Sequence, residues 1–425
     1  MNIYLDTIGC RLNQSEIESF AWQFRAAGHQ LVSSADLADL VVINTCTVTA
    51  AAAADSRQKL RQAARTGCTK IVATGCWATL EPALAAHLPG VNWVIANQDK
   101  ERLVPLVLQI PVGMLEREAA CRQPIPGTRQ RTRAFIKVQD GCNNRCAYCI
   151  TCLARGPARS RPIKDVLDDI RAALLGGAQE IVLTGVHLGT WGADFSPPMG
   201  LEQLIKAVLM NTDTPRLRLS SLEPWDIQPD FFTLWENHRL CRHLHLPLQS
   251  GCAATLQRMA RKITPEAYAA LLQTARSTVP QLAITTDIIT GFPGETEAEF
   301  QASLAFVERM NFAGGHVFTY SERPGTLAAR LPAKVPHNKR KERNALMQTV
   351  FSQAERTYQQ SFLGQELDVL WEKAIEYSPS KWELSGLTDN YLRVHSHATT
   401  PLWNQITPVK LIELSQYGLI GQIEF

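Results

Sequence analysis

Four cysteines stand close together in the stretch DGCNNRCAYCITCLARG (140–156). They are Cys142, Cys146, Cys149 and Cys152, and their spacing is C-x3-C-x2-C-x2-C. Thiolates two or three residues apart in one loop can wrap a soft metal centre. A structural zinc site usually takes two well-separated cysteine pairs, and no second pair follows here. A four-iron cluster takes one ligand per iron, so three thiolates would leave one iron open to a substrate. The spacing favours a cluster, with a simple zinc loop as the alternative.

A second set of cysteines is dispersed in the sequence but shares one structural context. Cys10, Cys46 and Cys76 directly follow strand-like runs, in IGC, NTC and TGC. Ligands of open parallel sheets bind outside the carboxyl ends of the strands, so we expect the three thiols to meet at one edge. The alternative is that each is an ordinary buried cysteine. Cys68 precedes its strand and Cys121 lies in a linker, so both are expected elsewhere.

The elements that must position these cysteines fall into three segments. Residues 1–110 alternate strands and helices, which predicts a doubly wound parallel sheet. The expected strands are 2–9, 40–45, 70–75 and 91–97, and a helix is expected to begin after a cap at Asn13.

Residues 128–357 alternate again, which predicts a partial (β/α)6 barrel. Its strands are expected at 134–138, 180–185, 216–221, 243–249, 282–291 and 316–320. The four-cysteine loop directly follows the first of them, at the end where barrel chemistry is expected. Residues 360–425 contain short alternating runs, which predict a small all-β barrel resembling an OB-fold. That last segment is acidic, with eight Asp or Glu against four Lys or Arg.

Composition limits the class of protein. Of the 425 residues, 45% are apolar and 20% charged, which is typical of globular domains. No apolar run approaches the roughly 20 residues that span a bilayer. The N-terminus has no basic segment before an apolar run, so we expect a cytoplasmic protein without a membrane partner. Eleven cysteines in such a compartment indicate metal or catalytic thiols rather than disulfides.

Basic residues gather on both sides of the four-cysteine loop. Before it stand Arg129, Arg131 and Arg133, and after it Arg155, Arg159 and Arg161, with a further basic run at 334–343. Such stretches suit a phosphate-rich partner, although solvated surface charge is the plainer alternative.

The loop after the first barrel strand resembles the signature of the radical S-adenosylmethionine enzymes. The resemblance rests on C-x3-C-x2-C with Tyr148 before its third cysteine, and on LTGVHLG (183–189), LPLQSG (246–251) and DIITGFPGETE (287–297) at later strand ends. It implies that Cys142, Cys146 and Cys149 hold a [4Fe-4S] cluster whose open iron binds S-adenosylmethionine, which is cleaved to a 5′-deoxyadenosyl radical. By position, it also implies cofactor contacts at Tyr148, Gly185, Gln249 and Gly291.

The resemblance extends over the whole chain to the methylthiotransferase family. That family combines an N-terminal domain (here 1–110), a radical S-adenosylmethionine core (128–357) and a C-terminal TRAM barrel (360–425). It implies a second [4Fe-4S] cluster, which delivers sulfur, on Cys10, Cys46 and Cys76. A fourth ligand would close the open iron of the first cluster, so we expect Cys152 to stay free. Members commonly have Pro-Tyr where this chain has Cys152 and Leu153.

Within the family, NTCTVT (44–49), KVQDGCNN (137–144), ARGPARSRP (154–162) and SSLEP (220–224) most resemble the threonylcarbamoyladenosine tRNA methylthiotransferases. The implied reaction is C2-methylthiolation of that nucleoside at position 37 of tRNA, beside the anticodon. It uses two S-adenosylmethionine molecules, a sulfur donor and a reductant such as flavodoxin or ferredoxin. A base of the anticodon loop can be splayed out into a protein pocket, so the anticodon loop is the part of the tRNA that we expect this protein to contact.

Three alternatives stay open at this point. Related members act on isopentenyladenosine in tRNA or on an aspartate of a ribosomal protein. A third reading, of a different class, is a zinc-stabilised RNA-binding protein without enzymatic activity. Iron and sulfide analysis separates this last one, since the enzyme predicts about eight irons per chain.

Overall fold

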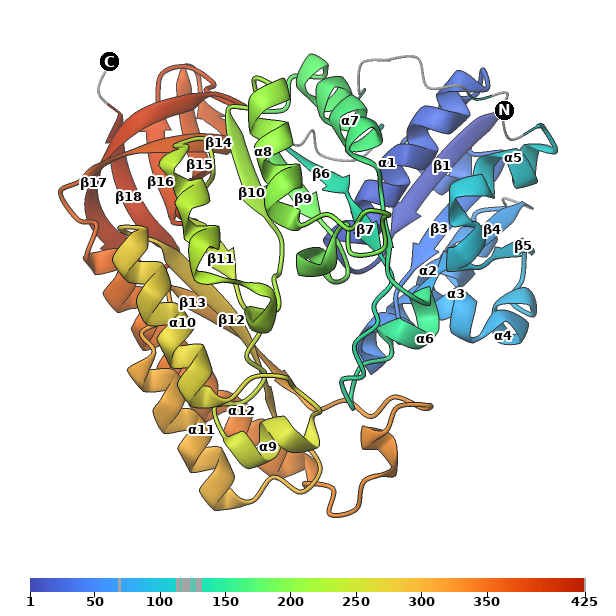
Figure 1. The fold of residues 1–425 in the computed structure, drawn as a ribbon. Helices are drawn as coiled ribbons and strands as arrows, with labels where there is room; N and C mark the ends of the chain where they lie inside the picture. The colour runs from blue at the N-terminus through green and yellow to red at the C-terminus, as the bar shows by residue number, and fades with distance from the viewer. Residues whose placement is uncertain (68–69, 112–114, 116–122, 124, 127–131, 424–425) are drawn as a thin grey trace.

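The computed structural model describes residues 1–67, 70–111, 115, 123, 125–126 and 132–423. Cys68 and Cys121, and with them Arg129 and Arg131, lie outside the described residues. Figure 1 shows an N-terminal sheet on one side, a C-terminal barrel on the other, and the remaining strands and helices between them.

The N-terminal part is a five-stranded parallel sheet in the order β2-β1-β3-β4-β5. Its strands are β1 (Asn2–Thr7), β2 (Gln30–Leu31), β3 (Leu40–Thr45), β4 (Ile71–Gly75) and β5 (Val91–Ile95). Its helices are α1 (Arg11–Ala26), α2 (Ala50–Arg65), α3 (Cys76–Leu80), α4 (Pro82–Ala86) and α5 (Leu103–Leu108). The four expected strands are confirmed, and the short edge strand β2 was not expected.

Both faces of this sheet are covered, because its strands are apolar on both sides. Residues of α1 and α5 pack with Ile3, Leu5 and Val42 on one face. Residues of α2, α3 and α4 pack with Val41 and Ile43 on the other. Successive apolar side chains of β3 therefore point alternately into two separate cores.

The central part contains six parallel-running strands that form two three-stranded sheets rather than one continuous barrel wall. The orders are β10-β9-β6 and β11-β12-β13. The strands are β6 (Arg133–Lys137), β9 (Glu180–Thr184), β10 (Arg216–Leu219), β11 (His243–His245), β12 (Ala283–Thr290) and β13 (Gly314–Thr319). A single parallel bridge, Leu217 with Leu240, leads from one sheet toward the other. The expected strand at 243–249 ends at His245, since Pro247 cannot donate a ladder hydrogen bond.

Helices and a short ribbon complete the central part. The helices are α6 (Thr151–Arg155), α7 (Ile163–Leu175), α8 (Leu201–Asn211), α9 (Ala253–Arg258), α10 (Pro265–Thr278), α11 (Glu297–Arg309) and α12 (His337–Gln360). The ribbon pairs β7 (Gln139–Asp140) with β8 (Arg159–Ser160) on either side of the four-cysteine loop. It therefore closes the base of that loop.

The C-terminal part is a closed five-stranded barrel in the order β14-β15-β16-β18-β17. The strands are β14 (Glu366–Ser378), β15 (Lys381–Thr388), β16 (Arg393–Ala398), β17 (Ile406–Ser415) and β18 (Gly418–Ile423). Trp371, Val394 and Leu411 fill its core. The predicted doubly wound N-terminal sheet, parallel β/α central part and small C-terminal β-barrel are confirmed.

The excess of acidic over basic residues in this barrel is explained by its contacts with the central part. Asp389 accepts from Arg242 (Nε to Oδ2, 2.7 Å), and Glu372 pairs with Arg133 (2.6 Å). Arg218 of β10 donates to the carbonyl oxygen of Asp389 at 2.9 Å. The acidic side chains thus dock the barrel on arginines of the central part.

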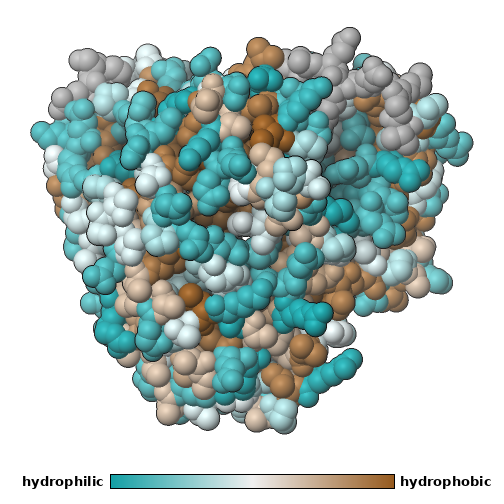
Figure 2. Space-filling model, viewed as in Figure 1, coloured by the Kyte–Doolittle hydropathy of each residue, from teal (hydrophilic) through white to brown (hydrophobic). Residues whose placement is uncertain are grey.

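No described helix is both long enough and apolar enough to cross a membrane. Figure 2 shows a mainly polar face on which apolar residues form separate patches rather than one continuous surface.

Candidate functional site: two sets of thiols

The N-terminal cysteines lie where the strand ends predict them. Cys10 follows β1 and precedes α1, Cys46 follows β3, and Cys76 is the first residue of α3. Cys46 and Cys76 are buried, whereas Cys10 is exposed. Burial raises the pKa of Cys46 to about 11, and the neighbouring Cys10 and Cys76 thiols raise it as well. The three thiols are therefore close enough to affect one another.

Two glycines permit this close approach. Gly9 and Gly75, each directly before a cysteine, have φ values of 102° and 96°, a region that side chains other than glycine avoid. A Cβ at Gly9 would lie 2.6 Å from Sγ of Cys46. The Gly-Cys pairs of IGC and TGC are thus required by the crowding of the three loops.

The central cysteines Cys142, Cys146 and Cys149 lie between β7 and α6, at the carboxyl end of the first central strand. Cys152 is the second residue of α6. Cys142 Sγ accepts from the backbone N–H of Asn144 (3.3 Å) and lies 3.8 Å from His187 Nδ1. Arg261 directs Nη1 at Cys146 Sγ over 3.9 Å and forms an ion pair with Glu223 at 2.7 Å. Burial raises the pKa of Cys146, and the Arg261 guanidinium offsets part of that rise.

His187 is itself held by a carboxylate. Its Nε2 lies 2.6 Å from Asp226 Oδ2. Burial alone would lower the pKa of His187, but its hydrogen bonds with Asp226 and Cys142 raise it to about 9. Both His187 and Arg261 were missed at the level of sequence, although His187 belongs to LTGVHLG. Each follows a different strand, and only the fold brings them to the cysteine loop.

Cys152 interacts with its neighbours in the four-cysteine loop. Its Sγ donates to the carbonyl oxygen of Asn144 at 2.9 Å. A hydrogen bond between Cys152 and Cys149 lowers the pKa of Cys149 and raises that of Cys152. Cys152 therefore behaves as the protonated donor of the pair, and whether it binds a metal stays a prediction.

The residues expected to contact S-adenosylmethionine occupy the same region. Tyr148 lies within the loop and packs against the small cluster formed by Ala147, Met259 and Phe292. Gly185 follows β9, and a Cβ there would lie 3.0 Å from Gln139 Oε1. Gln249 and Gly291 adopt left-handed backbone conformations after β11 and β12, with φ values of 76° and 71°. Their roles stay predictions.

The chemistry of the donors suits clusters at both sets, since all six residues are free thiols. Within the described residues, no group of three His, Cys, Asp or Glu side chains is arranged to hold a metal ion. The assignment of the six cysteines as cluster ligands stays a prediction. It rests on the positions of their loops, on the effect of the N-terminal thiols on the pKa of Cys46, and on the donor type.

A buried polar network joins the two sets. Arg155, the last residue of α6, donates to Glu16 and Asp140 (2.9 Å each) and to Asn13 Oδ1 (2.7 Å). Asn13 Nδ2 donates to the carbonyl oxygens of Ile8 and Thr45, next to the Cys10 and Cys46 loops. Asn13 was expected to cap α1, but the helix begins at Arg11 and this side chain instead ties two loops together.

Asn97 makes the third connection. Its Nδ2 lies 3.6 Å from Cys76 Sγ and donates to the carbonyl oxygen of Ala154 at 2.7 Å. Glu16, at the centre of the network, also accepts from Lys100 at 2.6 Å. Burial raises the pKa of Glu16, but Arg155 and Lys100 outweigh it and hold the carboxyl ionised. The loop after the central cysteines is thereby fixed to all three N-terminal cysteine loops.

The idea that the basic residues around the loop bind phosphates needs correction. Arg155 is only 3% exposed and fully engaged, so it cannot reach a phosphate. Arg161 pairs with Asp169 at 2.7 Å, and Arg133 with Glu372. In the 334–343 run, Arg343 is buried against Glu295. Arg159 is exposed, as is Arg145 between the first two central cysteines.

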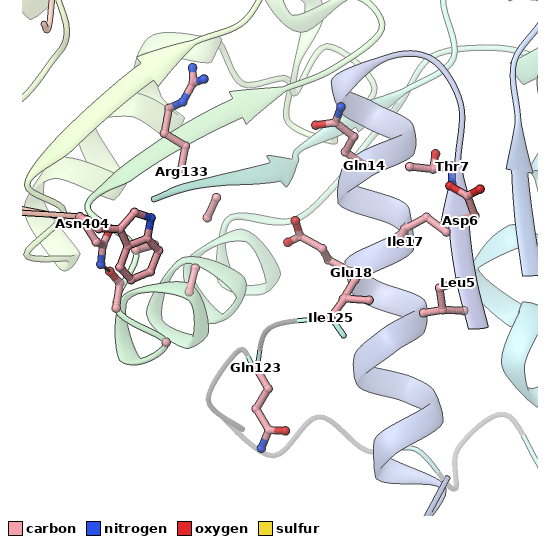
Figure 3. Close-up of a pocket in the computed structure, with 16 residues that line it drawn as sticks. Leu5, Asp6, Thr7, Gln14, Ile17, Glu18, Gln123, Ile125, Arg133 and Asn404 are labelled. Carbon is pink, nitrogen blue, oxygen red and sulfur yellow. Dashed lines mark hydrogen bonds between the residues drawn. The ribbon is translucent and has the colours of Figure 1, made fainter. Parts of the chain in front are cut away.

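A pocket elsewhere in the fold does not belong to this site. Figure 3 shows it between β1, α1 and residues near the C-terminal barrel, with Gln14 and Glu18 of α1 and Asn404 around it. Arg133, at the start of β6, also lines it. The cysteine loop follows the other end of that strand, so this pocket is separate from the thiols.

Two family models match separate parts of the chain. The Radical SAM superfamily matches residues 136–307, and the group described as Uncharacterized protein family UPF0004 matches residues 2–96. A structure of the radical S-adenosylmethionine methyltransferase TsrM from Kitasatospora setae superposes with a TM-score of 0.53 at 15% identity. It covers 75% of this chain and 72% of that one. The fold and the cysteine loop together define a radical S-adenosylmethionine enzyme.

Relatives that are similar over nearly the full chain indicate which radical S-adenosylmethionine family it belongs to. A threonylcarbamoyladenosine tRNA methylthiotransferase of Bacillus subtilis is 34% identical over 418 residues, covering 96% of this chain and 93% of the relative. A tRNA-2-methylthio-N(6)-dimethylallyladenosine synthase of Novosphingobium aromaticivorans is 31% identical over 429 residues, covering 98% and 96%. The chain belongs to the methylthiotransferase family of radical S-adenosylmethionine enzymes and modifies tRNA. It is therefore a transferase of sulfur-containing groups, which excludes the non-enzymatic alternative.

Proposed function

We propose that this enzyme transfers a methylthio group to C2 of N6-threonylcarbamoyladenosine at position 37 of tRNA. The observation that carries the proposal is the fixed relation between the two sets of thiols through Asn97, Arg155 and Asn13. An iron–sulfur cluster and S-adenosylmethionine belong to the family. We place one [4Fe-4S] cluster on Cys142, Cys146 and Cys149, and a second on Cys10, Cys46 and Cys76.

The bound groups supply the chemistry: electron transfer, radical activation of the C2–H bond, sulfur and methyl donation. Two S-adenosylmethionine molecules and an external sulfur source are proposed for each turnover. The chain itself positions these groups. Arg261 and the Asn144 N–H hold the sulfur atoms of Cys146 and Cys142 in place through hydrogen bonds. Tyr148, Gly185, Gln249 and Gly291 are proposed to shape the S-adenosylmethionine site at the strand ends.

The anticodon loop is the proposed RNA contact. The two exposed arginines at the cysteine loop, Arg145 and Arg159, are available for its phosphates. Charge reversal of Arg145 is expected to weaken tRNA affinity and to reduce the slope of log affinity against log salt concentration by about 1. If binding and its salt slope stay unchanged, Arg145 does not contact phosphate.

We also propose a cytoplasmic enzyme that receives electrons from flavodoxin or ferredoxin. The proposed domains are 1–110, 128–357 and 360–425. Reductant choice is tested by the rate of S-adenosylmethionine cleavage with each purified electron donor in place of dithionite. A donor that supports no cleavage is excluded.

The substrate assignment is supported by the relatives, since the protein of Thermotoga maritima named threonylcarbamoyladenosine tRNA methylthiotransferase is also 34% identical over 427 residues. Nucleoside mass spectrometry of tRNA from a deletion strain tests it. Loss of the methylthio form of threonylcarbamoyladenosine is expected. Loss of the methylthio form of isopentenyladenosine instead would mean a different tRNA substrate while leaving the enzyme class intact.

A further inference from the structure

One arginine connects the carboxyl ends of both sets of strands. Arg323 lies in the loop after β13, and in Figure 1 this orange loop extends from the central part toward α6. Its Nη2 donates to Thr47 Oγ1 at 2.6 Å, directly after Cys46. Ser321 of the same loop accepts from the backbone N–H of Ala50 at 3.4 Å. The loop thus places a guanidinium beside the proposed second cluster.

This guanidinium is buried without a compensating carboxylate. Arg323 is 9% exposed, and its Nε has no hydrogen-bond partner. Among the residues that the structure describes, none of the ion pairs involves Arg323. Burial lowers its pKa, the Cys46 thiol opposes that effect, and Arg57 adds to it. A buried, unpaired charge is costly, and arginine presents a planar fork that matches a carboxylate. The arrangement suits an anionic ligand that enters during function.

Exposed apolar side chains stand on the segments that meet at the Arg323 loop. Val48 is 54% exposed, Leu153 55% and Leu327 61%, which is unusual for side chains of their kind. Val48 follows the threonine that Arg323 contacts, and Leu153 Cδ1 would lie 3.2 Å from a Cβ placed at Gly325. Exposed apolar side chains close to one buried charge, here called the apolar rim, are typical of a site that binds a flat organic group with a charged substituent.

We propose that Arg323 binds the carboxylate of the threonylcarbamoyl group, while the apolar rim contacts the modified base. This proposal rests on the function proposed above, and it assigns that site a determinant of substrate choice. A hydrocarbon substituent such as isopentenyl would leave the guanidinium unpaired. Substrates that lack a group which a buried polar site is built to bind are rejected strongly.

The test uses two synthetic anticodon stem–loops and the reconstituted holoenzyme. One stem–loop carries N6-threonylcarbamoyladenosine at position 37, and the other carries the same nucleoside with its carboxylate converted to the neutral primary amide. The wild-type enzyme is expected to favour the carboxylate by about 10- to 100-fold in kcat/KM. Arg323→Gln is expected to lose that preference while its rate on the amide changes little.

Arg330→Gln is the matched control, because Arg330 is an exposed arginine of the same loop. It should keep the wild-type preference. Arg323→Lys keeps the positive charge and should retain part of the preference, which also covers the case in which the glutamine variant does not fold. Iron content and uncoupled S-adenosylmethionine cleavage are measured in each variant, since neither should change if Arg323 acts on the substrate alone.

The possible failures are distinguishable. A wild-type enzyme that treats carboxylate and amide alike, or an Arg323→Gln variant that loses equal rate on both or loses iron, overturns the carboxylate site but leaves the threonylcarbamoyladenosine assignment standing. A wild-type enzyme that methylthiolates an isopentenyladenosine stem–loop and neither of these two overturns both proposals.

Discussion

The guanidinium of Arg155 and the carboxylate of Glu16, 139 positions apart in the sequence, form a buried ion pair with Nη1 and Oε1 2.9 Å apart. Both side chains are 2% exposed. The pair joins the helix after the central cysteines to the helix after Cys10. This buried pair is therefore one of the contacts that fix the relative position of the two thiol sets.

Replacing Arg155 by methionine is expected to destabilise the protein by about 3–5 kcal/mol, because Glu16 and Asp140 would keep buried charges with one partner fewer. Denaturant unfolding measures the loss. Arg159→Met is the control, since Arg159 is an exposed arginine of the same loop, and it should stay within about 0.5 kcal/mol of the wild type. Equal stability of the two variants would show that the network adds nothing.

Several features of the site could be predicted from the sequence because they follow from strand order. The carboxyl ends of parallel strands share one edge, so the sequence alone predicts that Cys10, Cys46 and Cys76 lie together. The position of the central loop followed from the same rule. The glycines of IGC and TGC carried a further signal, because crowded loops require positive φ.

The direction of the arginine side chains could not be predicted in this way. Arg155 stands in a basic stretch, yet its partners Glu16 and Asn13 belong to the N-terminal helix α1, and no local pattern indicates them. The contact of Arg323 with Thr47 could not be predicted either, because the two residues are 276 positions apart in the sequence. Charge patterns in a sequence indicate the sign of a region, whereas burial and pairing depend on long-range packing.

A second buried pair predicts a pH dependence. Burial raises the pKa of Glu180, but Arg218, at 2.7 Å, outweighs it and holds the pKa below the ordinary value of 4.5. The folded state therefore favours the ionised carboxylate. This contribution is complete above the unfolded pKa and is lost as the pH falls through the lower folded value.

Local stability around β10 should accordingly decline as the pH falls below about 4.5, when measured by amide hydrogen-exchange protection factors corrected for intrinsic rates. Glu180→Gln should flatten that decline. Glu342→Gln serves as the control, because Glu342 forms an exposed pair with Lys339 and should leave the profile unchanged. Identical profiles for the wild type and Glu180→Gln would contradict the assignment.

The N-terminal thiols are expected to hold half of the iron. Changing Cys10, Cys46 and Cys76 together to alanine should leave about four of about eight irons per chain after anaerobic reconstitution. S-adenosylmethionine cleavage should persist, because the central cluster is intact, while methylthio transfer should stop. Cys252→Ala, at a cysteine outside both sets, should keep all the iron. Full iron content in the triple variant would exclude the second cluster.

Cys152 gives the sharpest prediction about the central loop. Its thiol donates to the Asn144 carbonyl oxygen at 2.9 Å, and a serine hydroxyl can make the same hydrogen bond. Cys152→Ser should therefore keep the iron of the central cluster and the cleavage of S-adenosylmethionine, since a fourth thiolate ligand would close the iron that must stay open. Cys149→Ser is the matched change three residues away and should lose both. Loss of iron from Cys152→Ser would instead make Cys152 a ligand, and the assignment of the three thiolates would have to be revised.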